Sequence, residues 1–111
     1  MIISIGDVYA QIPQHAAIED AMLAAQSAAR RQDGCVSYAF AETIDEPGHY
    51  IVVQSWRDQE ALDAHYRSDD FAAYQSAIAP LLVRHSELRT YLVGEAMRFA
   101  ESSLIKTDQD D

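Results

Sequence analysis

The sequence has few basic residues and almost no cysteine, and each shortage excludes a class of protein. Its 111 residues include 8 lysines and arginines against 18 aspartates and glutamates, a formal charge of −10. Nucleic acids and anionic membranes bind clustered cations, so we expect neither as a partner. The single cysteine, Cys35, excludes an intrachain disulfide and a cysteine-based metal cluster, and it fits a reducing cytoplasm.

Long apolar runs, glycine and proline are also scarce. No run of about 18 apolar residues occurs, and residues 1–12 lack a basic segment before a hydrophobic one, so we expect a cytoplasmic chain without a leader or membrane anchor. The apolar fraction of 49% is typical of an ordered globular protein. We place one domain at residues 1–95, followed by a C-terminal extension, residues 96–111, with an acidic, flexible tail.

Apolar periodicity predicts four strands and two helical regions. Residues 2–12 favour a strand that Pro13 ends, and helical spacing from Ile18 to Ala29 predicts a helix that Gly34 terminates. Residues 35–56 predict a hairpin with its turn at 45–48, in which Val36, Tyr38 and Phe40 share a face. Helical spacing returns after Asp58 and again over 68–82, and 87–95 is the last strand. A short helix could follow it.

This order of elements predicts an α+β fold of the ferredoxin-like βαββαβ type. Right-handed crossovers give a four-stranded antiparallel sheet with the helices on one face. Apolar residues occur on both faces of the strands, so the face without helices needs another cover. A second subunit, packed sheet on sheet, is the simplest one, and we expect a homodimer.

Two stretches of the sequence, DGCVSYAF and HYIVVQSWRDQEALDAHYRSDDF, resemble the antibiotic biosynthesis monooxygenase domain family. The family pattern has Gly-Cys-x-x-Tyr at a strand start, Glu-x-Trp at a strand end and Ala-Leu-x-x-His in a helix. The positions that match include Gly34, Cys35, Tyr38, Trp56 and His65. The resemblance implies a dimeric α+β barrel. For some members it also implies oxidation of electron-rich aromatic rings to quinones by O2 with no metal or flavin, whereas other relatives degrade haem, isomerise small molecules or have no assigned activity.

Three positions depart from the patterns of this family and its relatives. Gln54 stands where the family has an acid, and Asp70 stands where a second histidine is common. Gln75 occupies the place of a histidine found in the haem-degrading relatives, which disfavours haem as a ligand. The fold therefore transfers more readily than the chemistry.

The predicted site centres on His65. A neutral imidazole accepts a proton near pH 7, and the apolar helix face disfavours its charged form, so His65 is predicted to be the catalytic base. Gln54 and Trp56 share a strand face and are predicted to orient the substrate ring. The alternatives are structural: a hydrogen-bonded core histidine, a satisfied buried amide and a core aromatic.

Further candidates come from the strands and helices around it. Tyr38, Tyr74 and Tyr91 are predicted to point hydroxyls at the substrate or else to pack, and Asp7 is either a second proton acceptor or a surface acid. The remaining histidines (His15, His49 and His85) fall at element ends, where we expect them to be solvated. No His-x-x-x-His or Glu-x-x-His pair on a helix predicts a metal site.

These observations favour a cofactor-independent monooxygenase that acts on a small aromatic, quinol-like or anthrone-like substrate. Two other functions stay open. One is a dimeric module that binds a small apolar ligand without chemistry, and the other is an isomerase that uses His65 without oxygen.

Overall fold

The computed structural model describes residues 1–94, which form a four-stranded sheet and three α-helices. In chain order the elements are β1 (Ile2–Tyr9), α1 (His15–Arg30), β2 (Cys35–Glu42), β3 (His49–Trp56), α2 (Gln59–Tyr66), α3 (Asp69–Ile78) and β4 (Glu87–Leu92). Short 3-10 turns, η1 (Ile12–Gln14) and η2 (Ala79–Leu81), precede α1 and follow α3. The predicted domain end at 95, the short helix and the acidic tail lie outside the described residues.

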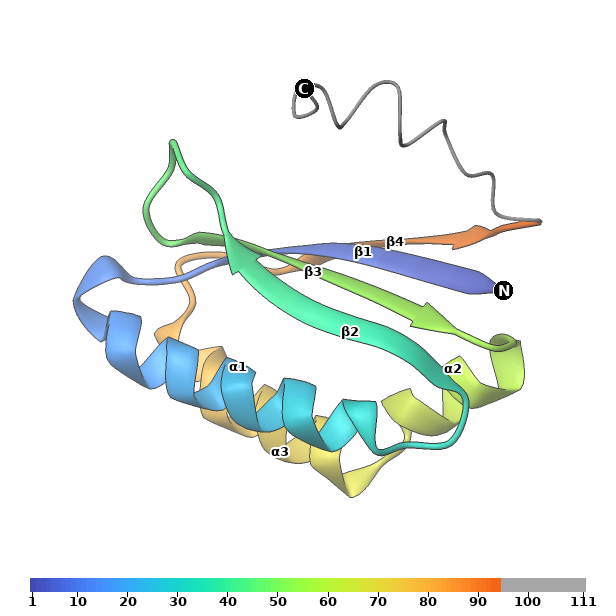
Figure 1. Ribbon diagram of the computed structural model, residues 1–111. Helices are drawn as coiled ribbons and strands as arrows, with labels where there is room; N and C mark the ends of the chain where they lie inside the picture. The colour runs from blue at the N-terminus through green and yellow to red at the C-terminus, as the bar shows by residue number, and fades with distance from the viewer. Residues whose placement is uncertain (95–111) are drawn as a thin grey trace, which may run out of the picture.

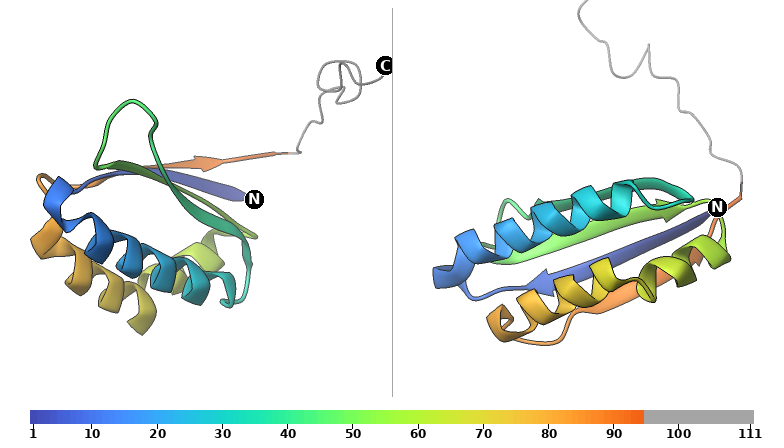
Figure 2. Two further views of the ribbon diagram at one scale, coloured as in Figure 1. Left: turned by 60° about the vertical axis from the view of Figure 1, so that its left-hand side comes forward. Right: turned by 90° about the horizontal axis from the view of Figure 1, so that it is seen from below.

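The sheet is antiparallel, with strand order β2-β3-β1-β4. All three helices lie on one face of it (Figure 1), and α1 runs beside α3 when the molecule is seen from below (Figure 2). The predicted ferredoxin-like α+β fold is confirmed. No helix within residues 1–94 has the length and apolar character needed to cross a membrane.

Local sequence signals fix where the helices begin and end. The Asp58 carboxylate accepts a hydrogen bond from the Ala61 amide at 2.9 Å, which caps α2 as predicted. Ser68 caps α3 in the same way through the Phe71 amide at 3.1 Å. Gly34 follows α1 with a φ of 85°, a left-handed conformation that favours glycine.

Two sequence-based expectations for the strands were wrong. The first strand ends at Tyr9 instead of Ile12, because the chain turns into η1 around Pro13. Val36 does not share a face with Tyr38. A bulge shifts the register between Cys35 and Ser37, and the extra residue, Val36, is exposed.

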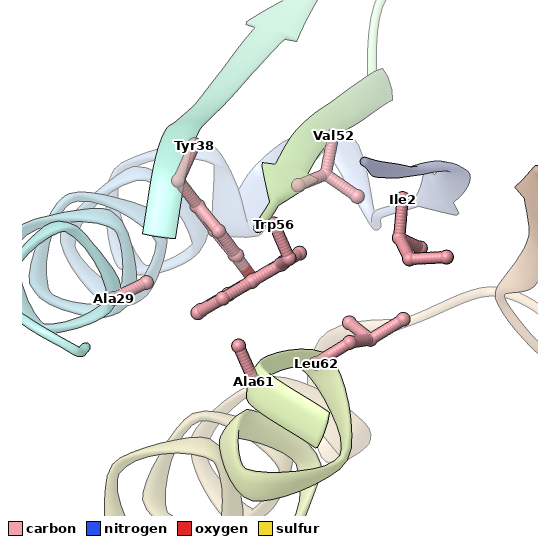
Figure 3. Close-up of a cluster of buried hydrophobic side chains, with 7 residues drawn as sticks. All are labelled: Ile2, Ala29, Tyr38, Val52, Trp56, Ala61 and Leu62. Carbon is pink, nitrogen blue, oxygen red and sulfur yellow. The ribbon is translucent and has the colours of Figure 1, made fainter. Parts of the chain in front are cut away.

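The main core lies between the sheet and α1 and α2. Figure 3 shows the Trp56 indole among its neighbours; the cluster consists of Ile2, Ala29, Tyr38, Val52, Trp56, Ala61 and Leu62. Trp56 is fully buried. Alanines on α1 and α2 let both helices approach the sheet closely, which leaves room for this large side chain.

Candidate active site

A second space under the sheet remains open as a cavity of about 380 Å³. It lies between the helix-covered face of the sheet, α3 and the segment that leads into β4. Gly6 of β1 lines it, and a Cβ atom there would come within 3.0 Å of the Val52 and Leu88 side chains. The cavity is of the size that takes a small organic molecule.

Aromatic side chains form much of the cavity wall. Phe40 and Phe71 line it together with three tyrosines, Tyr38, Tyr66 and Tyr74. Burial raises the pKa of all three tyrosines, so each hydroxyl stays protonated near neutral pH. The Tyr66 hydroxyl is buried and has no hydrogen-bond partner within residues 1–94. The wall therefore combines flat apolar surface with hydrogen-bond donors.

Gln54 adds an amide to this wall, and Trp56 sets its orientation. Trp56 Nε1 donates to Gln54 Oε1 at 2.7 Å, and both side chains are buried. An indole N–H only donates, so the atom that faces it must be the amide oxygen. The Gln54 NH2 group is then left for other partners. Gln54 lines the cavity, whereas Trp56 lies behind it.

His65 lies one layer behind the cavity wall. It is 4% exposed and stacks on Trp56 with ring centroids 4.8 Å apart. Its Nδ1 lies 2.8 Å from Gln32 Oε1, and Gln32 Nε2 in turn donates to Ser68 Oγ. Nδ1 therefore donates to the amide oxygen, and Nε2 is left buried and without a partner in the described chain.

Desolvation lowers the pKa of His65 to about 4, although the charge of Asp70 opposes the shift. The imidazole is thus neutral at pH 7, with a free lone pair on Nε2. The His65 ring lies 5.4 Å from the Tyr38 ring and 5.2 Å from the Tyr66 ring, centroid to centroid. His65 does not line the cavity itself, but two tyrosines that do lie against it.

The structure places two other predicted site residues on the opposite face of the sheet. Asp7 borders the cavity, but its carboxylate lies 2.8 Å from His49 Nε2 and 3.7 Å from an Arg89 nitrogen. Tyr91 pairs with Ile3 in the sheet and is 47% exposed. Of the predicted residues, then, Tyr38, Gln54 and Tyr74 meet in the cavity, and Tyr91 and the Asp7 carboxylate face away from it.

Sequence reasoning missed three residues that line the cavity. Tyr66 follows His65 directly, and its position on the apolar face of α2 was the available signal. His85 and Glu87 line the cavity near the start of β4, where both residues are exposed. Their polar character at the start of a strand gave no indication that they line the same cavity as Gln54.

Within residues 1–94, no group of three metal-ligating side chains converges on this cavity. Such a group does occur elsewhere, at the beginning of α1. The cavity offers a substrate aromatic walls, hydroxyl donors and an oriented amide.

Sequence comparison relates the chain to one family. The family model for antibiotic biosynthesis monooxygenase matches residues 1–77, which is more than half of the chain. An uncharacterized protein from Synechocystis is 30% identical over 66 residues, or 60% of this chain. The chain spans 45% of the length of that relative.

Solved structures share the fold at low sequence identity. A protein from Deinococcus radiodurans, named as a candidate antibiotic biosynthesis monooxygenase, is 26% identical with a TM-score of 0.84 over 89% of this chain and 98% of its own. A similarly named protein from Nitrosomonas europaea is 13% identical with a TM-score of 0.80, over 84% and 98% of the two chains. At 13% identity, the similarity to the Nitrosomonas europaea protein shows a shared fold and nothing more.

Proposed function

Since the chain belongs to the antibiotic biosynthesis monooxygenase family, we propose that it oxidises a small electron-rich aromatic molecule, of the quinol or anthrone type, with O2 and without a cofactor. One observation carries the proposal. The cavity has aromatic walls, three protonated tyrosines and the Gln54 amide. Such a wall suits a flat ring whose oxygen becomes negatively charged.

The reaction needs only the substrate and oxygen. Loss of a proton converts the ring to an enolate-like anion, and a ring carbon of this anion forms a bond with O2. The resulting peroxide loses water and leaves a carbonyl. In balance, one CH2 group and one O2 give one C=O and one H2O, so the substrate supplies all four electrons and no external reductant takes part.

The donors of the cavity stabilise the anion in this proposal. The Gln54 NH2 group and the tyrosine hydroxyls donate to the oxyanion in a space partly closed to water, where such bonds are strong. Trp56 acts through Gln54, because its N–H holds the amide oxygen and turns the NH2 group toward other acceptors. Trp56 is thus a positioning residue.

His65 receives the substrate proton indirectly in this proposal. Its Nε2 and the Tyr66 hydroxyl are both buried without partners, and the two rings are neighbours. One water molecule between the two groups would join them into a relay from the cavity. Because His65 must be neutral to accept a proton, turnover should fall as the pH is lowered toward about 4.

The proposal includes a homodimer formed through the face of the sheet that carries no helix. We call this the open face; Ile3, Ile5, Ile51 and Val53 lie on it. Without helices to cover them, these four side chains form an apolar patch of the kind that associates in water. A second copy of the chain would bury it by packing sheet on sheet.

The experiment is oxygen uptake by the full chain with a panel of anthrones and quinols, followed by product spectra. The key variant is Gln54→Glu, which keeps the shape and the acceptor for Trp56 but replaces the donor with a charge. We expect kcat/KM to fall by about 100-fold or more. His65→Gln should lower turnover and remove the acid limb of the pH profile, whereas His85→Gln should keep that limb.

Three outcomes would contradict the proposal. Product formation that continues without oxygen would indicate an isomerase, and a bound ligand that is released unchanged with no oxygen uptake would indicate a binding module. Equal or higher turnover by Gln54→Glu would show that the amide does not stabilise an oxyanion.

A further inference from the structure

Three potential metal ligands converge at the beginning of α1, outside the aromatic cavity. His15 Nε2 lies 3.1 Å from Glu19 Oε2 and 3.1 Å from Glu42 Oε1. One ligand atom from each residue lies within 4.8 Å of the other two. None of the three residues lines the aromatic cavity, so the cluster is separate from the proposed active site.

The fold brings these side chains together from two elements. His15 opens α1 and Glu19 lies one helical turn later, so both project from the same side of the helix. Glu42 ends β2, and its second oxygen accepts a hydrogen bond from the Gly48 amide at 3.0 Å. This bond holds the carboxylate toward His15, as partners of metal ligands commonly do.

The distances suit a small divalent cation. Ligands around tetrahedral zinc lie about 3.3 Å apart, because Zn–N and Zn–O bonds are about 2.0–2.2 Å long. The two separations of 3.1 Å from His15 Nε2, at which His15 also pairs with both carboxylates, are close to that value, and the two carboxylate oxygens lie within 4.8 Å of each other. One imidazole and two carboxylates form a three-residue ligand set that leaves a fourth position for water.

Tyr50 supplies a second, independent observation beside this cluster. It is 2% exposed, and its hydroxyl is buried without a hydrogen-bond partner in residues 1–94. Tyr50 lines one recess together with Glu19 and Glu42, and its ring centroid lies 6.0 Å from that of His15. A buried hydroxyl beside this cluster is a donor in need of an acceptor.

We propose that His15, Glu19 and Glu42 bind a divalent transition-metal ion such as Zn²⁺. A water molecule takes the fourth position, and the Tyr50 hydroxyl donates to it. The ion joins the beginning of α1 to the end of β2 and so fastens the helix to the β2–β3 hairpin. The site is independent of the proposed oxygenase reaction.

The test is a calorimetric titration of the chelator-treated full chain with Zn²⁺ at pH 8, repeated with Co²⁺ to record its visible spectrum. We expect one ion per chain and a spectrum typical of low coordination number. His15→Gln and Glu42→Gln should each weaken binding by about tenfold or more. His85→Gln, at an exposed histidine outside the cluster, should bind as the wild type does.

Two further measurements distinguish a site from a loss of folding or from another cluster. Far-UV circular dichroism should show every variant folded, and Zn²⁺ should raise the melting temperature of the wild type but not of His15→Gln. Tyr50→Phe should bind the ion more weakly than the wild type. The proposal is overturned if millimolar Zn²⁺ does not bind, or if binding survives His15→Gln and is lost in His49→Gln.

Discussion

The two faces of the sheet give the same kinds of side chain opposite properties. On the helix-covered face, Val52, Gln54 and Trp56 of β3 are buried under α1, α2 and α3. On the open face of the same strand, Val53 is 42% exposed. Successive residues of one strand therefore alternate between the apolar interior and the solvated surface.

Two histidines, one on each face of the sheet, have pKa values that are shifted in opposite directions. Desolvation on the buried face of α2 lowers the pKa of His65 to about 4. His49 on the open face lies between Asp7 and Glu46, at 2.8 and 3.1 Å, and the hydrogen bond that it donates to Asp7 raises its pKa. Burial favours the neutral form of the His65 imidazole, whereas the two carboxylates favour the charged form of the His49 imidazole. Environment, not residue type, decides which of them can accept a proton near pH 7.

The largest contrast between the faces should be in stability. Trp56→Ala removes a fully buried indole and its hydrogen bond to Gln54, so we expect the free energy of unfolding to fall by about 3–5 kcal/mol. Val53→Ala, on the other face of β3, should cost less than about 1 kcal/mol in the monomer. Urea unfolding measures both. Similar losses would mean that the two faces are equally buried.

Self-association should depend on the open face. Val53→Lys places a cation there, and in a symmetric dimer both copies would bring it to the interface. We expect the dimer dissociation constant to rise by about 100-fold or more, measured by sedimentation or light scattering. Val36→Lys, at an exposed bulge residue, is the matched control. A wild-type chain that is monomeric at micromolar concentration would contradict the homodimer.

The fold was predictable because its signals are local. Helical spacing, the Asp58 cap and Gly34 fix the elements, and the crossover rule then allows few arrangements. The bulge at Val36 was not predictable, because the apolar residues Val36, Tyr38 and Phe40 alternate as in a regular strand and nothing in this pattern marks the extra residue that shifts the register. Pro13 signalled that β1 ends nearby, but the predicted end at Ile12 lies three residues after the observed end at Tyr9.

The site was predictable only in part, because the parity of a residue shows its face and not its depth. Parity correctly put Gln54 and Trp56 on one face of β3, but it could not show that Trp56 lies behind the cavity. To place Tyr91 on one face of the sheet, the register between β4 and β1 must be known, and the sequence alone does not show this register. The His15, Glu19 and Glu42 cluster joins residues from separate elements, so helix spacing alone could not show it.

The pH dependence of stability should have opposite signs for the two histidines. The pKa of His65 is about 4 in the folded state, below its ordinary value of 6.5, so the unfolded chain takes up the proton first. Its contribution is complete above pH 6.5 and is lost as the pH falls toward 4. His49 has a raised pKa, so its contribution is present below pH 6.5 and is lost as the pH rises through the folded value.

Comparison of variants isolates these effects from the titration of the carboxylates. Between pH 7 and pH 5 we expect the wild type to lose about 2 kcal/mol more than His65→Gln, measured by urea unfolding at each pH. His49→Gln should show the reverse difference from the wild type. An NMR titration that finds His65 protonated at pH 6 would contradict the assignment.

The smallest effect should come from a tyrosine on the open face. Tyr91→Phe removes a half-exposed hydroxyl, so we expect changes below about 0.5 kcal/mol in stability and below about twofold in kcat/KM. Tyr38→Phe removes the same oxygen atom from the cavity wall and should lower kcat/KM by about tenfold. The two variants thus remove the same hydroxyl group from opposite faces of the sheet. If Tyr91→Phe were the more damaging of the two, the reaction would have to take place on the open face, within the dimer interface, and the donor-lined cavity beneath the sheet would not be the active site.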